Sequence, residues 1–288
     1  MIVVAGSASR KIAHGICEVL SCDLANVEIK RFPDGEAYVR IDDDLSGEDV
    51  IVVQTTYPDE NIVELFLIHD AVREFKLNSM ITVAPYFGYG RQDKKFKDGE
   101  AVSARAMARH IEMDADAFIT VDVHSPEALS YFSIKANNTT AMGVIGEYLT
   151  SLREMPEMVI APDDGAIERA KIVAEKLDAD WDYMEKVRID GENVEIFPKN
   201  VDVEGKVVVV VDDIISTGGT MAKAGEILKA FGAKKVYSAC THGIFAKNAL
   251  ERLRNVFDVV LSTDTIERST SLISAARPIA TAIKNALG

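Results

Sequence analysis

Short apolar runs alternate with amphipathic stretches along most of this chain. In the first half, the apolar runs lie at residues 2–5, 49–54, 80–85 and 117–121. Runs without polar alternation are typical of strands buried on both faces of a parallel sheet, and the stretches between them place apolar residues at helical spacing. The pattern therefore predicts an α/β fold, in which a doubly wound parallel sheet has helices on both faces.

The same rhythm restarts in the second half of the chain. Its predicted strands lie at residues 158–162, 180–186 (as an edge strand), 207–211, 235–241 and 258–261, before a C-terminal helix. The periodicity lapses around residues 134–140, and Pro156 interrupts the pattern that follows. We therefore expect two doubly wound parallel-sheet domains, residues 1–145 and residues 146–288.

The sequence VVVVVDDIISTGGT predicts a central strand that leads into a ligand-binding turn. Its five consecutive valines cannot alternate between a core and solvent, so this strand is expected to be buried on both faces. The candidate ligand residues that follow are Asp212, Asp213, Ser216, Thr217, Gly218, Gly219 and Thr220. A glycine-rich turn at a helix amino terminus suits a phosphate, and the two carboxylates can accept hydrogen bonds from vicinal hydroxyls. The segment indicates a sugar-phosphate site; the alternative is a tight turn that Asp caps and Gly relaxes.

Composition and charge narrow the class of protein. The 288 residues are 48% hydrophobic and 27% charged, which is typical of a folded globular chain long enough for two domains. A formal net charge of −14 argues against broad nucleic-acid or anionic-membrane binding, because both need basic faces. The three cysteines Cys17, Cys22 and Cys240 form no disulfide framework and are predicted core thiols. No apolar run reaches about 18 residues and no signal peptide is visible, so we expect a cytoplasmic protein.

Unusual polar residues recur where predicted strands end, which is where doubly wound sheets bind ligands. His124 and Asp163 lie at two such ends, together with other carboxylates. Oxygen ligands with one imidazole favour Mg²⁺, with Mn²⁺ as the alternative, over structural zinc. A single histidine at a strand end is more often an ordinary hydrogen-bonded residue, so each group alone carries little weight.

Two basic clusters stand out on this acidic chain. The segment RQDKKFKDGE contains Arg91, Lys94, Lys95 and Lys97, and its concentration of positive charge favours polyphosphate binding. A mobile surface loop is the alternative for this segment. Lys186 and Arg188 are two residues apart on a predicted extended segment, so they point the same way. The glycine- and asparagine-containing residues that follow them are similar to a flap.

Six motifs occur in the order seen in ribose-phosphate diphosphokinases. They are RFPDGE at 31–36, RQDKK at 91–95, FITVDVHS at 118–125, PDDG at 162–165, KVR at 186–188 and VDDIISTGGT at 211–220. The last of these closely resembles the phosphoribosyl-diphosphate loop of the type I phosphoribosyltransferase fold. The whole set resembles a short archaeal-type member of the diphosphokinase family, and it spans most of the chain.

The resemblance implies an ATP-dependent diphosphotransferase of nucleotide biosynthesis. It would transfer the diphosphoryl group of ATP to the 1-hydroxyl of ribose 5-phosphate, giving 5-phosphoribosyl 1-diphosphate and AMP. The resemblance implies that ATP is bound by Arg91 and Gln92 together with Phe32, Asp34, Gly35 and Glu36 of a neighbouring subunit. It implies that His124 and Asp163 bind Mg²⁺ and that Lys186 and Arg188 are catalytic. Ribose 5-phosphate would be bound by Arg188, Asp212, Asp213 and residues 216–220. The family also implies a homo-oligomer, at least a dimer.

Two departures from the family pattern and two rival functions remain. Asp164 stands where many relatives have a small residue, so a second carboxylate follows the expected metal ligand, and the chain is shorter than typical bacterial members. Base phosphoribosyl transfer is the rival enzyme activity, although such enzymes usually have one domain and lack the first four motifs. A catalytically silent regulatory relative is the other rival, and the presence of His124, Lys186 and Arg188 together argues against it.

Overall fold

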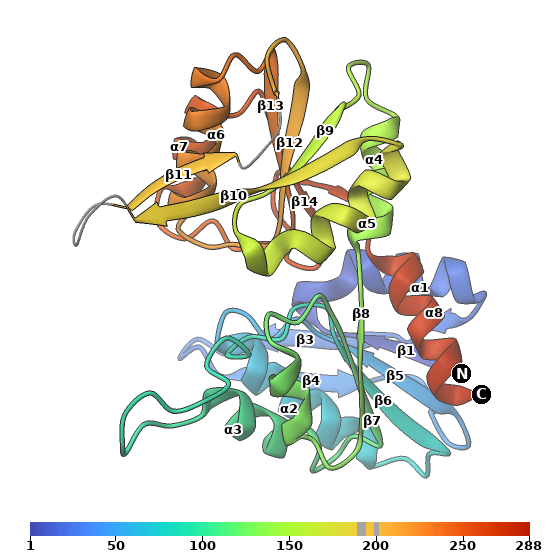
Figure 1. The fold of residues 1–288 in the computed structure, drawn as a ribbon. Coiled ribbons are helices and arrows are strands. Elements are labelled where there is room, and N and C mark those ends of the chain that lie inside the picture. The colour runs from blue at the N-terminus through green and yellow to red at the C-terminus, as the bar shows by residue number, and fades with distance from the viewer. Residues whose placement is uncertain (189–193, 199–201) are drawn as a thin grey trace. The chain divides into compact units, whose positions relative to one another are not determined.

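The chain folds into two compact units, each built around its own mainly parallel sheet (Figure 1). The computed structural model describes residues 1–188, 194–198 and 202–288, with only the backbone for 186–188 and 194–198. The first unit comprises Met1–Thr140, Thr265–Glu267 and Ser274–Gly288, and the second comprises Ala141–Asp264 and Arg268–Ile273. Both units have the predicted α/β, doubly wound architecture. No described helix is both long enough and apolar enough to span a bilayer.

The first unit contains a six-stranded parallel sheet in the order β2-β1-β5-β6-β7-β8. Its strands are β1 (Ile2–Ala5), β2 (Asp23–Leu24), β5 (Asp49–Val53), β6 (Ser79–Ala84), β7 (Ala117–Val121) and β8 (Lys135–Thr139). Its helices are α1 (Arg10–Leu20), α2 (Glu60–Arg73), α3 (Ser103–Ile111) and α8 (Ala276–Leu287). The parallel order means that the loops after β1, β5, β6 and β7 all leave from the same edge of the sheet, where the predicted ligand groups lie.

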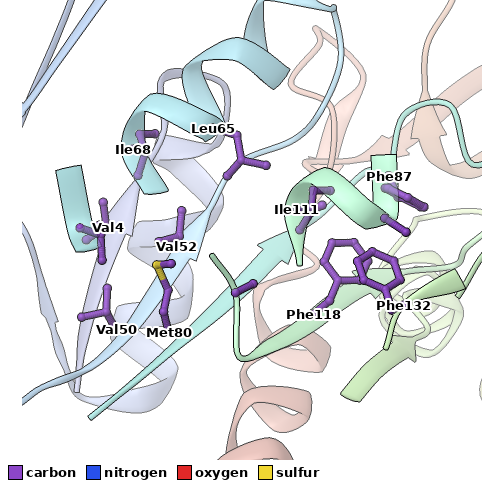
Figure 2. Close-up of a cluster of buried hydrophobic side chains, with 14 of the residues drawn as sticks. Val4, Val50, Val52, Leu65, Ile68, Met80, Phe87, Ile111, Phe118 and Phe132 are labelled. Carbon is purple, nitrogen blue, oxygen red and sulfur yellow. The ribbon is translucent and has the colours of Figure 1, made fainter. Parts of the chain in front are cut away.

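One face of this sheet packs against α2 and α3 (Figure 2). Val4, Val52 and Met80 from the strands meet Leu65 and Ile68 from α2 in one buried cluster. Three aromatic rings fill its far end, with the ring centroids of Phe118 and Phe132 4.4 Å apart and the planes nearly parallel. Helices α1 and α8 lie side by side (Figure 1). Helix α1 contacts β1 and β2, helix α8 contacts β7 and β8, and neither helix contributes a residue to this cluster.

A separate antiparallel hairpin confirms the predicted turn at PDGE. Its strands are β3 (Val27–Arg31) and β4 (Ala37–Ile41), whose apolar residues pack against the core of the first unit. Gly35 has φ +96°, a left-handed conformation that favours glycine. The Asp34 carboxylate accepts a hydrogen bond from the Glu36 N–H at 3.1 Å and so stabilises the same turn.

His69 gives the first unit a specific sensitivity to acid. Its side chain is fully buried in α2, Nε2 lies 2.8 Å from Thr82 Oγ1, and Nδ1 has no partner within the described residues. Burial lowers the pKa of His69 from 6.5 to about 4, with a smaller contribution from Arg73. The unfolded chain therefore binds the proton more tightly, so this group lowers stability as the pH falls from 6.5 towards 4.

We expect the free energy of unfolding to fall by about 3 kcal/mol across this window because of His69, since each tenfold difference in proton affinity is worth 1.36 kcal/mol. Urea unfolding of wild type and His69→Gln from pH 7 to pH 4 measures the effect as the difference between the two curves. The exposed His110→Gln variant is the control and should follow wild type. Parallel curves for wild type and His69→Gln would contradict the assignment.

The second unit contains a seven-stranded sheet in the order β11-β10-β9-β12-β13-β14-β15. Its strands are β9 (Met158–Ala161), β10 (Asp180–Arg188), β11 (Val194–Pro198), β12 (Val207–Ile215), β13 (Lys235–Gly243), β14 (Val259–Thr263) and β15 (Ser271–Ile273). Its helices are α4 (Met142–Thr150), α5 (Ile167–Leu177), α6 (Gly219–Ala230) and α7 (Ala249–Val256). Neighbouring strands are parallel except for β10 and β11, which run antiparallel.

The valine run is the centre of this sheet, as the sequence predicts. Val208 and Val210 enter the cluster beneath α6 and α7, whereas Val207, Val209 and Val211 enter the cluster beneath α4 and α5. All five are buried because helices cover both faces of β12. This strand therefore delivers Asp212 and Asp213 to the ligand edge from a rigid position.

Three elements differ from the sequence expectations. The segment around residues 134–140, where the periodicity lapses, is the edge strand β8; its mixed exposure explains the missing apolar signal. The segment at 180–186 is not an edge strand, because β11 pairs with β10 on its outer side. Helix α8 lies in the first unit rather than in the expected second domain, because its buried apolar face packs on α1 and β7.

Candidate active site

The acidic pair lies within β12, two residues before its carboxyl end, and contacts an arginine. Asp213 is 2% exposed, and its Oδ2 lies 3.3 Å from Nη2 of Arg169 on α5. The Asp213 N–H donates to Asp212 Oδ1 at 2.8 Å, so the Asp212 carboxylate is held against the backbone of Asp213. The second unit therefore presents one paired, buried carboxylate and one partly exposed carboxylate at this strand end.

The environment of Asp212 disfavours its charge. Burial is the largest cause, and the neighbouring Asp213 adds to it through a hydrogen bond and like-charge repulsion, so the pKa of Asp212 rises to about 8. Arg169 acts in the opposite direction and lowers this pKa. A ligand that donates hydrogen bonds to Asp212 would favour its charged form.

The turn after the acidic pair opens into the amino terminus of α6. Gly218 caps the helix with φ +72°, which favours glycine, and no atom lies within 4 Å of the position that a Cβ on Gly219 would occupy. The Thr217 carbonyl accepts a hydrogen bond from Arg252 Nη1 at 3.0 Å, and the Ser216 carbonyl accepts one from the Ala246 N–H. Thr220 is exposed in the first helical turn, where the backbone N–H groups lack intrahelical acceptors. This open, fixed turn has the properties of a phosphate site.

Asp163 lies at the carboxyl end of the adjacent strand β9. Its Oδ1 accepts a hydrogen bond from the Gly165 N–H at 3.1 Å, which leaves the second carboxylate oxygen for a ligand. A pocket of about 320 Å³ is lined by Asp163, Asp164, Tyr183, Met184 and Glu185. Three carboxylates around one pocket supply hard oxygen donors, the chemistry that Mg²⁺ prefers. No group of three or more potential ligands in metal-binding arrangement is found within the described residues.

In the first unit, the predicted ATP loop is tied to the His124 loop. Asp93, next to Arg91 and Gln92, accepts a hydrogen bond from Ser125 Oγ at 2.6 Å, and this bond is the main cause of the lowered pKa of Asp93. The Gln92 side chain accepts a hydrogen bond from Ser103, the first residue of α3. Arg91 and His124 are both exposed to solvent. The structure thus brings the loops of these two predicted ligands together within one unit.

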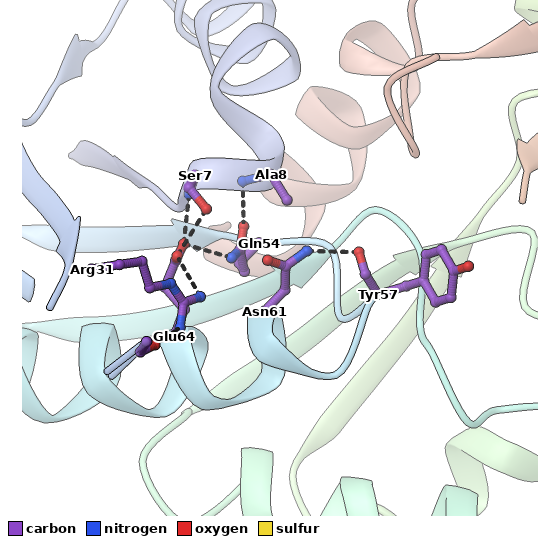
Figure 3. A network of polar contacts seen from close by, with 8 residues as sticks. Ser7, Ala8, Arg31, Gln54, Tyr57, Asn61 and Glu64 are labelled. Atoms are coloured by element: carbon purple, nitrogen blue, oxygen red, sulfur yellow. Dashed lines mark hydrogen bonds and ion pairs between the residues drawn. The ribbon is translucent and has the colours of Figure 1, made fainter. Parts of the chain in front are cut away.

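A buried polar network next to the hairpin was not predicted from the sequence (Figure 3). Glu64 of α2 is buried, and its carboxylate accepts hydrogen bonds from the Ser7 N–H and hydroxyl at 2.7 and 2.8 Å and from Gln54 Nε2 at 2.8 Å. Nη2 of Arg31 lies 3.8 Å from Oε2 of Glu64, and Nη1 of Arg31 donates a hydrogen bond to the Gly35 carbonyl in the hairpin turn. The network therefore connects the ends of β1 and β5 to the turn that carries the predicted adenine-binding residues, of which Phe32 is 46% exposed.

The predicted catalytic pair lies at the limit of the described residues. The backbones of Lys186 and Arg188 belong to β10, opposite Ile196 and Val194 of β11. Their side chains lie outside the residues that the structure describes, and so do residues 189–193 and 199–201 of the segment that is predicted to form a flap. Of the two predicted metal ligands, His124 belongs to the first unit and Asp163 to the second.

Comparisons with known proteins agree across the whole chain. Residues 1–114 match the model of the N-terminal domain of ribose phosphate pyrophosphokinase, and residues 130–274 match the phosphoribosyl transferase domain. Ribose-phosphate pyrophosphokinase of Methanopyrus kandleri is 44% identical over the full length of both chains. The Thermococcus kodakarensis enzyme of that name is 47% identical over 87% of this chain and 89% of its own. A crystal structure of phosphoribosylpyrophosphate synthetase from Mycobacterium smegmatis is 27% identical and superposes with a TM-score of 0.84, covering 99% of this chain and 98% of that one.

Proposed function

This chain belongs to the ribose-phosphate pyrophosphokinase family, and on that basis we propose which residues bind each substrate, which bind the metal and which are catalytic. The reaction transfers the diphosphoryl group of ATP to the 1-hydroxyl of ribose 5-phosphate, giving 5-phosphoribosyl 1-diphosphate and AMP. The observation that carries the proposal is the central strand β12, in which an acidic pair lies near the carboxyl end and which an open phosphate-type turn follows. Such a site suits an acceptor that has both a diol and a phosphate.

One assay separates this reaction from base phosphoribosyl transfer and from a silent relative. Purified protein is given ATP, Mg²⁺ and ribose 5-phosphate without any base, and AMP is measured over time. AMP formation that depends on ribose 5-phosphate is expected. Diphosphate release that requires a purine or pyrimidine would support the base transferase instead, and absence of turnover in both assays would support the silent relative.

The sugar phosphate would lie against β12 and α6. Asp212 and Asp213 would address the ribose hydroxyls, while residues 216–220 would bind the 5-phosphate through backbone N–H groups and the hydroxyls of Ser216, Thr217 and Thr220. Arg188 would add a positive charge near the acceptor. The glycines matter because they keep side chains out of the space that the phosphate needs, as the open position at Gly219 illustrates.

Conservative changes at the acidic pair test this assignment. Asp212→Asn and Asp213→Asn should raise the KM for ribose 5-phosphate about tenfold or more, because a hydrogen bond to a charged group contributes about 1.5–3 kcal/mol. The KM for ATP should change far less. Thr220→Val should also raise the KM for ribose 5-phosphate, because it removes a hydroxyl that would bind the 5-phosphate. An effect confined to ATP would show that the turn binds the nucleotide.

ATP would bind at the hairpin and the Arg91 loop. Phe32 offers an exposed ring for the adenine, Asp34, Gly35 and Glu36 form the adjoining turn, and Arg91 with Gln92 would contact the nucleotide. The family resemblance puts the hairpin of one subunit against the loop of another, so we propose a homo-oligomer that is at least a dimer. A monodisperse monomer with full activity would contradict this arrangement. A cytoplasmic location fits the same metabolic role.

We propose that His124 and Asp163 bind Mg²⁺. When bound, the ion would neutralise and orient the ATP phosphates, and the oxygen-rich pocket at Asp163, with Asp164 and Glu185, has a suitable donor set. Lys186 and Arg188 would stabilise negative charge on the transferred group.

Metal dependence gives a direct measurement of the His124 assignment. Removing Mg²⁺ with a chelator should abolish AMP formation, and His124→Ala should shift the Mg²⁺ activation curve to higher concentration, because one ligand is lost. His110→Ala, at another exposed histidine of the first unit, should leave the curve unchanged. Identical activation curves for wild type and His124→Ala would remove His124 from the metal site.

A further inference from the structure

We propose that Arg169 is a positioning residue for the sugar site, where it fixes the acidic pair and the Asp163 turn in one arrangement. The inference rests on the proposed function and deepens it, because the motifs that indicate the site do not include this arginine. Arg169 lies on α5, outside the strand ends and turns that carry the predicted ligand groups.

The guanidinium group of Arg169 joins two segments of the second unit. Nη1 donates to the Gly165 carbonyl at 2.9 Å, and Nη2 lies 3.3 Å from Asp213 Oδ2. At the first segment, Asp163 Oδ1 accepts the Gly165 N–H; at the second, Asp212 Oδ1 accepts the Asp213 N–H. A continuous set of polar contacts thus runs from the proposed metal ligand to the proposed diol ligands, and Arg169 is its midpoint.

Burial makes the contact between Arg169 and Asp213 consequential. The Asp213 side chain is 3% exposed and that of Arg169 is 19% exposed, so solvent screens the pair weakly. A buried carboxylate that loses its partner is strongly destabilised, and a second carboxylate next to it increases the repulsion. Arg169 therefore allows two adjacent carboxylates to keep a fixed geometry before any ligand arrives. In agreement, Arg169 opposes the rise in the pKa of Asp212.

The geometry also requires arginine rather than any cation. Its planar group donates in two directions at once, to a backbone carbonyl and to a carboxylate, whereas a lysine ammonium is a single point charge on a flexible stem. Lysine at this position would keep the charge beside Asp213 but would not reproduce the second contact to Gly165. Charge alone and positioning can therefore be separated by substitution.

The experiment compares Arg169→Met, Arg169→Lys and the control Lys171→Met. Lys171 lies on the same helix, is 41% exposed and pairs with the exposed Glu168, so its loss removes one positive charge without touching the site. Titration calorimetry gives the Kd for ribose 5-phosphate, steady-state assays give kcat and both KM values, and thermal unfolding reports stability. Because Arg169→Met removes the ion pair with the buried Asp213, Arg169→Lys, which keeps a positive charge beside Asp213, keeps the test readable if Arg169→Met unfolds.

Arg169→Met should raise both the Kd and the KM for ribose 5-phosphate about tenfold or more, since a charge-assisted contact is lost, with a KM for ATP within about twofold of wild type. Arg169→Lys should recover only part of this loss, and Lys171→Met should match wild type.

Wild-type sugar affinity in Arg169→Met would overturn the inference and leave the proposed function standing. Full recovery by Arg169→Lys would also overturn it, because charge alone would then suffice. A wild-type protein without sugar-dependent AMP formation would overturn both the inference and the proposed function.

Discussion

Replacing Lys186 with alanine is expected to lower kcat about 100-fold or more, equivalent to roughly 3 kcal/mol of transition-state stabilisation. Diphosphoryl transfer builds negative charge on the bridging oxygen and on the departing AMP. A cation that meets this charge mainly in the transition state raises kcat more than it tightens substrate binding. Both KM values should therefore change much less than kcat.

Steady-state kinetics with both substrates varied provides the measurement. Lys234→Ala is the control, because Lys234 is an exposed lysine of the same unit that pairs with Glu154 away from the sugar site. A simple exposed lysine contributes little, so that variant should keep wild-type kinetics. If kcat of Lys186→Ala stays within about threefold of wild type, less than 1.36 kcal/mol, Lys186 has no part in the mechanism.

Replacing Phe118 with alanine should lower the free energy of unfolding by about 4 kcal/mol, because truncating a buried phenylalanine loses its transfer free energy and leaves a cavity. Phe118 is fully buried on β7, stacks on Phe132, and packs edge-on against Phe87 at 5.2 Å (Figure 2). Such a site cannot collapse easily, since rings from three segments define its shape.

Urea unfolding followed by circular dichroism measures this loss. Phe96→Ala is the matched control, because Phe96 is 72% exposed and should cost less than about 0.5 kcal/mol. Phe118→Leu should fall between the two, since it keeps much of the buried apolar volume. A cost for Phe118→Ala no larger than that for Phe96→Ala would show that the aromatic cluster does not support the first unit.

Features that depend on local pattern could be predicted from the sequence. The run of five valines implies a strand without a wet face, and β12 has a helical layer on each side. The PDGE turn predicts the hairpin because Gly35 tolerates a left-handed conformation and Asp34 caps its own turn. In both cases the controlling interactions lie within a few residues of each other along the chain.

Features that depend on distant partners could not be predicted. Strand β8 has a polar sequence because it is an edge strand of mixed exposure, so it lacks the apolar run that reveals β12. Glu64 is one of several charged residues in helix α2, and only Ser7 and Gln54, which follow β1 and β5, explain how its buried carboxylate is satisfied. The positioning role proposed for Arg169 likewise depends on its ion pair with Asp213, which lies 44 residues later in the sequence.

The return of α8 to the first unit has a consequence for how the protein is made. Ile279 and Ile283 of α8 are fully buried. Ala276 packs so closely on α1 that a Cβ added to Gly15 would lie 2.8 Å from the Cβ of Ala276. These residues leave the ribosome after every residue of the second unit, which ends at Ile273. The strands of the first unit are therefore synthesised before the second unit, but its last helix is synthesised after it. The sheet of the first unit lacks the packing of α8 until the second unit has been synthesised.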